Sequence, residues 1–92
     1  MTKDELNKLK RDIEDLSFSS SAKAGQPLLR KIQFQITMLQ STVSDAYASN
    51  LLSEISAAIV SVPGNQRNGE NMLALAKQKL YQIESYVQEN DF

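Results

Sequence analysis

Apolar residues recur at spacings of three and four along four segments of this chain, and no segment alternates like a strand. This period places one apolar stripe on each helix, and a stripe is stable only when it packs against another element. We therefore predict helices over residues 3–16, 27–48, 50–62 and 69–89. The expected fold is all-α, a small antiparallel three- or four-helix bundle that forms a single domain over residues 1–92.

The predicted core consists of the residues on these stripes. They are Leu6, Leu9, Ile13, Leu16, Leu29, Ile32, Ile36, Leu39, Val43, Tyr47, Leu51, Leu52, Ile55, Ala58, Ile59, Val62, Met72, Leu73, Ala76, Leu80, Ile83 and Val87. The apolar phase shifts near Ala48 without a Gly or Pro. A bend there is favoured, but one continuous helix across this point stays an alternative.

The links between the stripes carry turn residues. Residues 17–26 are rich in serine, end near Gly25 and are predicted to be a loop, with Pro27 in the first turn of the next helix, where a missing N–H is tolerated. Residues 63–68 are predicted to be a turn, and residues 90–92 to fray. Candidate helix caps are Thr2 with Glu5, Ser49 or Asn50, and Asn68.

Charge is distributed unevenly along the 92 residues, whose net charge is −1. Residues 1–16 carry nine charged side chains, whereas residues 32–66 carry only Asp45 and Glu54. Lys, Glu and Arg normally cover the outer faces of helices in water, and their depletion is typical of interface centres and of helices buried on two sides. The middle of the chain is therefore predicted either to lie inside the bundle or to bind a partner.

Five apolar residues fall off the core stripes: Phe34, Met38, Val60, Leu75 and Tyr81. In a small bundle each helix is touched on two sides, so all five could belong to the core. The alternative is a protein interface, because Phe and Met are enriched in binding surfaces. The predicted partner-binding residues are Phe34, Met38, Arg30, Lys31, Val60 and Tyr81. Self-association as a homodimer is the simplest form of this hypothesis.

The composition argues against an enzyme. The chain has no His and no Cys, so the commonest general base, metal ligand and thiol nucleophile are all missing. The segment 64–69 has two glycines, but it lacks the Gly-Lys-Ser/Thr ending of a phosphate-binding loop and follows no strand. We therefore expect no catalytic residues, no cofactor and no metal.

The function predicted from these observations is a non-enzymatic protein–protein interaction module that binds or sequesters a partner protein. A small nucleic-acid-binding transcriptional regulator is the alternative, although the close basic pairs Lys10–Arg11, Arg30–Lys31 and Lys77–Lys79 are too scattered for a basic stripe. A structural subunit of a phage or secretion assembly is a second alternative. The start of the chain is charged and no run reaches the length of a membrane span, so a cytoplasmic protein is expected.

The size, the four-helix pattern and the Gln26-Pro27-Leu28-Leu29 helix start resemble the small immunity proteins of class IIa bacteriocin producers. The resemblance implies an all-α protein that acts as an immunity protein, and it carries no residue over. The end Glu89-Asn90-Asp91-Phe92 departs from their more basic C-terminal regions. The size is also similar to helical-hairpin proteins exported by type VII systems, but the chain has no Trp for their Trp-x-Gly turn, and Tyr86 is followed at the fourth position by Asn90 instead of an acid.

Overall fold

The computed structural model describes residues 3–16 and 21–90. Within these ranges it contains no strand and four helices: α1 (Lys3–Asp15), α2 (Ala22–Thr42), α3 (Ala46–Ile59) and α4 (Gly69–Asn90). The predicted all-α fold is confirmed. The candidate cap Thr2 and the first four residues of the predicted loop, 17–20, lie outside the described residues, as do residues 91–92 of the predicted frayed end.

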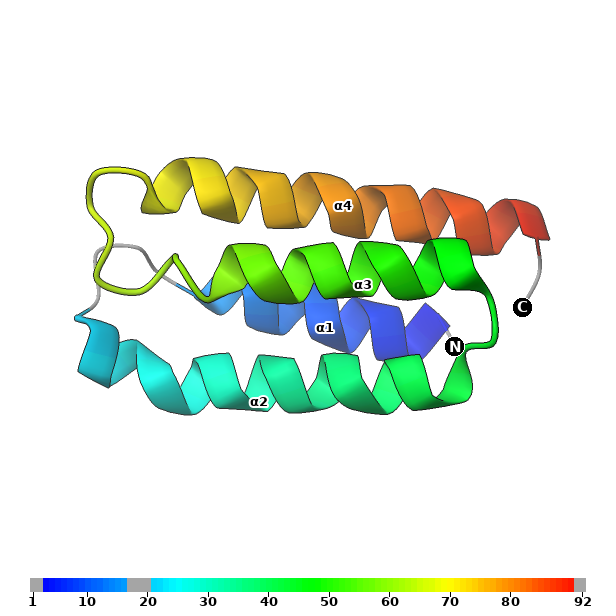
Figure 1. The fold of residues 1–92 in the computed structure, drawn as a ribbon, viewed down its shortest axis with the longest axis horizontal. Coiled ribbons are helices and arrows are strands. Elements are labelled where there is room, and N and C mark those ends of the chain that lie inside the picture. Colours follow the sequence, from blue (N-terminus) through cyan, green and yellow to red (C-terminus); the bar gives the residue numbers. More distant parts are fainter. Residues whose placement is uncertain (1–2, 17–20, 91–92) are drawn as a thin grey trace.

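The helices lie lengthwise side by side, and consecutive helices run in opposite directions (Figure 1). Each helix packs against its neighbours in the chain, and α1 closes the bundle by packing against α4. The contact between α3 and α4 is the most extensive. The bundle measures 38 × 21 × 19 Å, so it is one helix length long and two helices across.

The stripes meet in one core. Its members, each less than a tenth exposed, are Leu6, Leu9, Ile13, Leu16, Leu29, Ile32, Ile36, Leu39, Leu51, Leu52, Ile55, Ala58, Ile59, Val62, Ala76, Leu80 and Ile83. Full burial of a Leu or Ile side chain stabilises the fold by about 1.5–3 kcal/mol. Met72, Leu73 and Val87 pack against this core while partly exposed. The prediction for Tyr47 is wrong, because its side chain is 49% exposed.

The start of α2 differs from the prediction. The helix begins at Ala22, five residues before the predicted start, and Ser21 caps it by accepting a hydrogen bond from the backbone N–H of Ala24 at 3.0 Å. Pro27 therefore lies in the second turn of α2, where it leaves one backbone carbonyl without its usual donor. Gly25 is buried there against Pro63. This contact joins the start of α2 to the turn that follows α3.

Helices α2 and α3 are separate. Three residues, Val43 to Asp45, stand between them, and Asp45 caps α3 in place of the predicted Ser49 or Asn50. One carboxylate oxygen of Asp45 accepts from the backbone N–H of Ala48 at 3.0 Å, and the other accepts from the hydroxyl of Tyr86 at 2.7 Å. Because Tyr86 belongs to α4, a single side chain both starts α3 and attaches this turn to α4.

These hydrogen bonds shift the pKa values of both Asp45 and Tyr86. The bond from the Ala48 N–H, followed by the bond from Tyr86, lowers the pKa of Asp45 from its ordinary value of 3.8. The hydrogen bond to Asp45, followed by burial, raises the pKa of Tyr86 above 10.0. The ring of Tyr86 also contacts the ring of Tyr47, with centroids 4.7 Å apart. The pair is bonded when Asp45 is charged and Tyr86 is neutral.

The link from α3 to α4 follows the prediction of a turn at residues 63–68. Gly64 has a φ of 74°, which side chains with a Cβ disfavour. Helix α4 begins at Gly69, as predicted, and extends one residue beyond the predicted end. Asn68 precedes it, but its side-chain oxygen accepts from the side-chain amide of Asn71 at 3.0 Å instead of from the backbone.

Gly25→Ala is expected to destabilise the bundle. A Cβ at position 25 would lie 2.6 Å from Cβ of Pro63, so either the helix or the turn must shift. Overpacking of this kind costs about 1–3 kcal/mol. Helix propensity alone would have the opposite effect, a gain of up to about 1 kcal/mol. Urea unfolding of the variant measures the balance. The neighbouring exposed variant Ala24→Gly reports propensity alone, and a Gly25→Ala protein more stable than wild type would contradict the contact.

Asp45→Asn is expected to change how stability depends on pH. Because the folded-state pKa of Asp45 is lowered, its contribution is present above the ordinary value of 3.8 and is lost as the pH falls through the folded-state value. Asn can still cap α3 but has no charge to titrate. The melting temperature of wild type should therefore exceed that of Asp45→Asn at neutral pH, and the difference should shrink as the pH falls below 3.8. A difference that is independent of pH would contradict this.

Candidate protein-binding surface

Several large apolar side chains lie on the outside of the bundle. They are Phe34 at 66% exposure, Met38 at 52%, Tyr47 at 49%, Val60 at 53%, Leu75 at 37% and Tyr81 at 69%. Neither α1 nor α3 covers the outer face of α2, because each packs against one flank of it. The alternative that Phe34 and Met38 belong to the core is therefore wrong for the single chain. Their role in a contact with another protein stays a prediction.

Phe34 and Met38 border a groove between α1 and α2. The groove has a volume of about 290 Å³ and is lined by Glu5, Lys8, Lys31, Phe34, Gln35, Met38 and Leu39. Leu39 is buried and belongs to the core, so the floor of the groove continues the apolar interior. The charged lining residues Glu5, Lys8 and Lys31 are all exposed, which places charge along the sides. An apolar floor with charged margins is typical of a site for an amphipathic segment.

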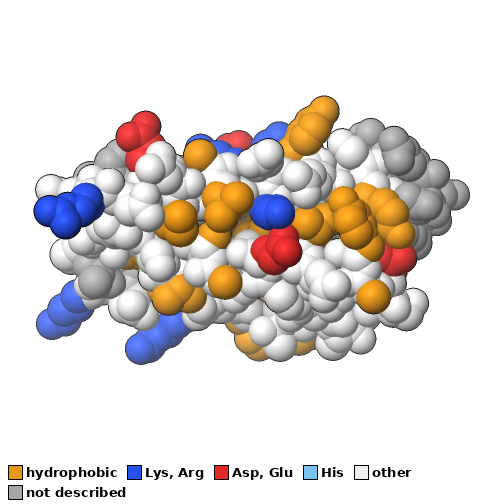
Figure 2. All heavy atoms as spheres, turned by 45° about the horizontal axis from the view of Figure 1, so that its top comes forward, with side chains coloured by type: hydrophobic (Ala, Val, Ile, Leu, Met, Phe, Trp, Pro, Cys, Tyr) orange, Lys and Arg blue, Asp and Glu red, His pale blue; other side chains and the backbone are white. Residues whose placement is uncertain are grey.

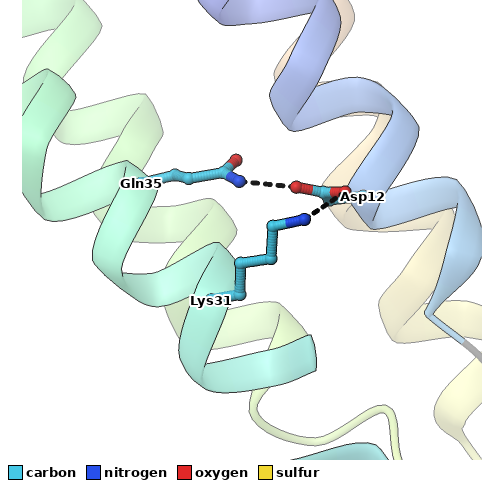
Figure 3. Close-up of polar contacts among 3 residues, drawn as sticks. All are labelled: Asp12, Lys31 and Gln35. Atoms are coloured by element: carbon cyan, nitrogen blue, oxygen red, sulfur yellow. Dashed lines mark hydrogen bonds and ion pairs between the residues drawn. The ribbon is translucent and has the colours of Figure 1, made fainter. Parts of the chain in front are cut away.

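A polar contact fixes the spacing of α1 and α2 beside this groove. Asp12 of α1 is only 8% exposed. Figure 3 shows Gln35 and Lys31, both from α2, directed toward its carboxylate. The Gln35 amide nitrogen donates to Oδ2, and the Lys31 ammonium lies 3.5 Å from Oδ1. A buried carboxylate is stable only with such partners. Lys31, predicted to bind a partner, thus also contacts Asp12 within the bundle.

The charges of α2 are all positive. Between Ala22 and Thr42 the helix carries Lys23, Arg30 and Lys31 and no acid, and all three cations are exposed. They lie in the half of the helix before Phe34, while the half after it has no charge. The outer face of α2 therefore changes from basic to apolar to uncharged polar along its length.

The face formed by α3 and α4 has a different character. Apolar side chains gather along the line between these helices, with few charges among them (Figure 2). One ion pair crosses the line, between Lys79 and Glu54 at 3.0 Å. The three tyrosines of the chain meet near the end of α4 in a hollow of about 270 Å³, lined by Tyr47, Tyr81, Gln82, Ser85 and Tyr86. This hollow is a shallow aromatic surface without charged lining residues.

The structure thus brings together only part of the predicted binding set. Phe34, Met38 and Lys31 share the α1–α2 groove, and Arg30 precedes Lys31 on the same helix. Tyr81 instead borders the tyrosine hollow and a second hollow of about 180 Å³ between α1 and α4. Val60 lies directly after the last residue of α3. Neither belongs to the groove that contains Phe34.

Two polar contacts that join helices of the bundle were not predicted from the sequence. Asp12 stands next to the stripe residue Ile13, and Gln35 stands next to Ile36, so each lies at the margin of its stripe. Polar residues at such margins face a neighbouring helix, and this position was the available signal for their pairing. No comparable signal links Asp45 to Tyr86, because 41 positions separate them.

Asp12→Ala should destabilise the bundle by about 1–3 kcal/mol, because it leaves the Gln35 amide nitrogen without its acceptor in a partly buried place. Asp15→Ala, at an exposed position of α1, should change stability by less than about 0.5 kcal/mol. Urea unfolding of both variants makes the comparison. Equal effects of the two substitutions would show that the Asp12 contact adds no stability.

Among the described residues, no group of three or more acidic side chains is arranged to hold a metal ion. None of the helices in that part of the chain combines the length and apolar character needed to cross a membrane. In comparison with known proteins, no family model, no curated protein and no solved structure matches the chain. The likeness to bacteriocin immunity proteins therefore stays a prediction.

Proposed function

We propose that this protein is a non-enzymatic binding module that acts by occupying or sequestering a partner protein, as immunity, inhibitor and adaptor proteins do. The observation that supports the proposal most is the exposed pair Phe34 and Met38 beside the α1–α2 groove. Burial of each side chain by a partner would contribute about 1.5–3 kcal/mol. A single exposed apolar residue needs no explanation, but two residues one helical turn apart form a patch.

The surroundings of this pair also support protein binding. The pair is framed on one side by Lys31 and Arg30 and on the other by Ser41 and Thr42. Interface centres are poor in charge and rich in Phe and Met, and charges at the rim favour one partner over others. The partner would therefore bring an apolar segment for the groove and acidic groups for the basic end of α2.

Nucleic-acid binding is the second candidate, and one observation favours it: α2 carries three cations and no acid. Against it, α1 lies beside α2 and carries five acids among its nine charged residues. Gel-shift experiments with duplex DNA and with RNA at low salt test this candidate, since electrostatic binding is strongest there. No complex is expected. A submicromolar complex that weakens steeply with salt would favour nucleic acid over protein as the ligand.

Photo-cross-linking tests the protein-binding proposal directly. Benzoylphenylalanine at position 34 keeps an aromatic ring in the patch, and the same group at exposed Gln78 of α4 is the matched control. In cells that make the protein, position 34 should form a discrete adduct with another protein, and position 78 should not. Met38→Glu in the same chain should abolish the adduct, because it adds a charge to the patch. Equal adducts at both positions, or none at position 34, would refute the proposal.

A further inference from the structure

The pair Phe34 and Met38, here called the α2 patch, is symmetric about one level of the helix. The two residues lie four positions apart, which corresponds to about 6 Å along the axis. Both side chains are more than half exposed, at 66% and 52%. The level midway between them is that of Ile36, whose own side chain is buried in the core. A two-fold axis at this level would exchange the positions of Phe34 and Met38 between two copies of the chain.

The charges of α2 distinguish between the two directions in which a second α2 could lie on the first. If the two α2 helices run in the same direction, Arg30 and Lys31 lie opposite the same two residues of the second copy, and the like charges repel. If the two helices run in opposite directions, Arg30 lies opposite Thr42 of the second copy and Lys31 lies opposite Ser41. Asp45 follows shortly after, and the end of a helix carries partial negative charge. The antiparallel arrangement therefore avoids this repulsion and brings the cations of each copy toward the negative end of the other α2.

The apolar side chains are complementary in the same arrangement. Phe34 of each copy lies opposite Met38 of the other, so the contact occurs twice around the axis. A Met sulfur beside an aromatic ring is a favourable contact, and the flexible Met side chain adapts to the ring. Met38 and Leu39 also line the α1–α2 groove, which gives the ring of the second copy an apolar place to enter.

We propose that the α2 patch binds a second copy of this chain through a two-fold antiparallel α2–α2 contact that pairs Phe34 with Met38 of the second copy. The proposal rests on the proposed function in one respect, since both require this face to bind protein. The second copy and a different partner then compete for one face. Self-association would set the amount of free patch and would make sequestration depend on the concentration of the protein.

Analytical ultracentrifugation tests the association. At about 1 mM, where even weak contacts are populated, wild type should sediment at twice the chain mass of 10.3 kDa. Phe34→Glu and Met38→Glu should each raise the dimer dissociation constant at least about tenfold, because each places two carboxylates in the apolar contact. Both should keep the helical circular dichroism of wild type, since neither side chain belongs to the core. Ala74→Glu adds the same charge at an exposed position of α4 and should leave the dimer unchanged.

Cysteine pairs test the orientation, because the chain has no Cys of its own. Arg30 and Thr42 lie six residues on either side of the level of Ile36, so a two-fold axis at that level places each opposite the other in the second copy. In the antiparallel dimer Arg30 of one copy approaches Thr42 of the other, while two copies of either residue stay roughly 18 Å apart. The double variant Arg30→Cys/Thr42→Cys should therefore form a disulfide-linked dimer on oxidation, and neither single variant should. A disulfide-linked dimer of either single variant, or no disulfide-linked dimer of the double variant, would overturn the proposal. A wild type that is monomeric at about 1 mM would overturn it as well.

The two proposals fail in different ways. If wild type is monomeric and no disulfide forms, while position 34 still cross-links to another protein, the second copy is excluded and the binding function stands. If the dimer and the disulfide form as described but position 34 cross-links only to a second copy, the dimer stands and sequestration of another protein is excluded.

Discussion

The burial of one apolar stripe per helix is the constraint on which the rest of the structure depends. A chain of 92 residues has little interior. In the part of the chain that the structure describes, the core has seventeen buried apolar members, which come from all four helices and from Leu16 and Val62 shortly after α1 and α3. No helix of the described chain is enclosed on every side, because each packs against two neighbours. A large apolar residue on the outward side of a helix must therefore face water or another molecule. The exposure of Phe34 and Met38 is a direct result of this geometry.

The same constraint explains how much of the fold could be predicted. Spacings of three and four identified all four helices and nearly the whole core, since the stripes are what the helices bury. The ends of α2 were predicted wrongly. Gly25 and Pro27 indicate a helix boundary when read locally, yet Gly25 is helical because it allows close contact with Pro63. Tertiary contact outweighed local preference at this place.

The candidate site was predictable to a smaller extent. Periodicity alone placed Phe34 and Met38 opposite the stripe of their helix, and the structure finds them exposed. Periodicity could not show that Phe34 and Met38 lie apart from Val60 and Tyr81 on the surface, because this depends on which helices are neighbours. Nor could it show that Lys31 contacts Asp12, since that contact joins two helices and spans 19 positions. The amino-acid composition indicated that the chain has a binding surface. The boundaries of that surface could be found only from the packing of the helices.

The two ends of the bundle are fastened by different kinds of contact. At one end Gly25 lies against Pro63, a steric contact that involves no titratable group. At the opposite end the attachment of the α2–α3 turn to α4 depends on a charged Asp45 and a neutral Tyr86. Protonation of Asp45 in acid weakens this attachment, and ionisation of Tyr86 weakens it in strong alkali, because its folded-state pKa is raised. Of these two contacts, only the one at the end where α1 begins and α4 finishes therefore depends on pH.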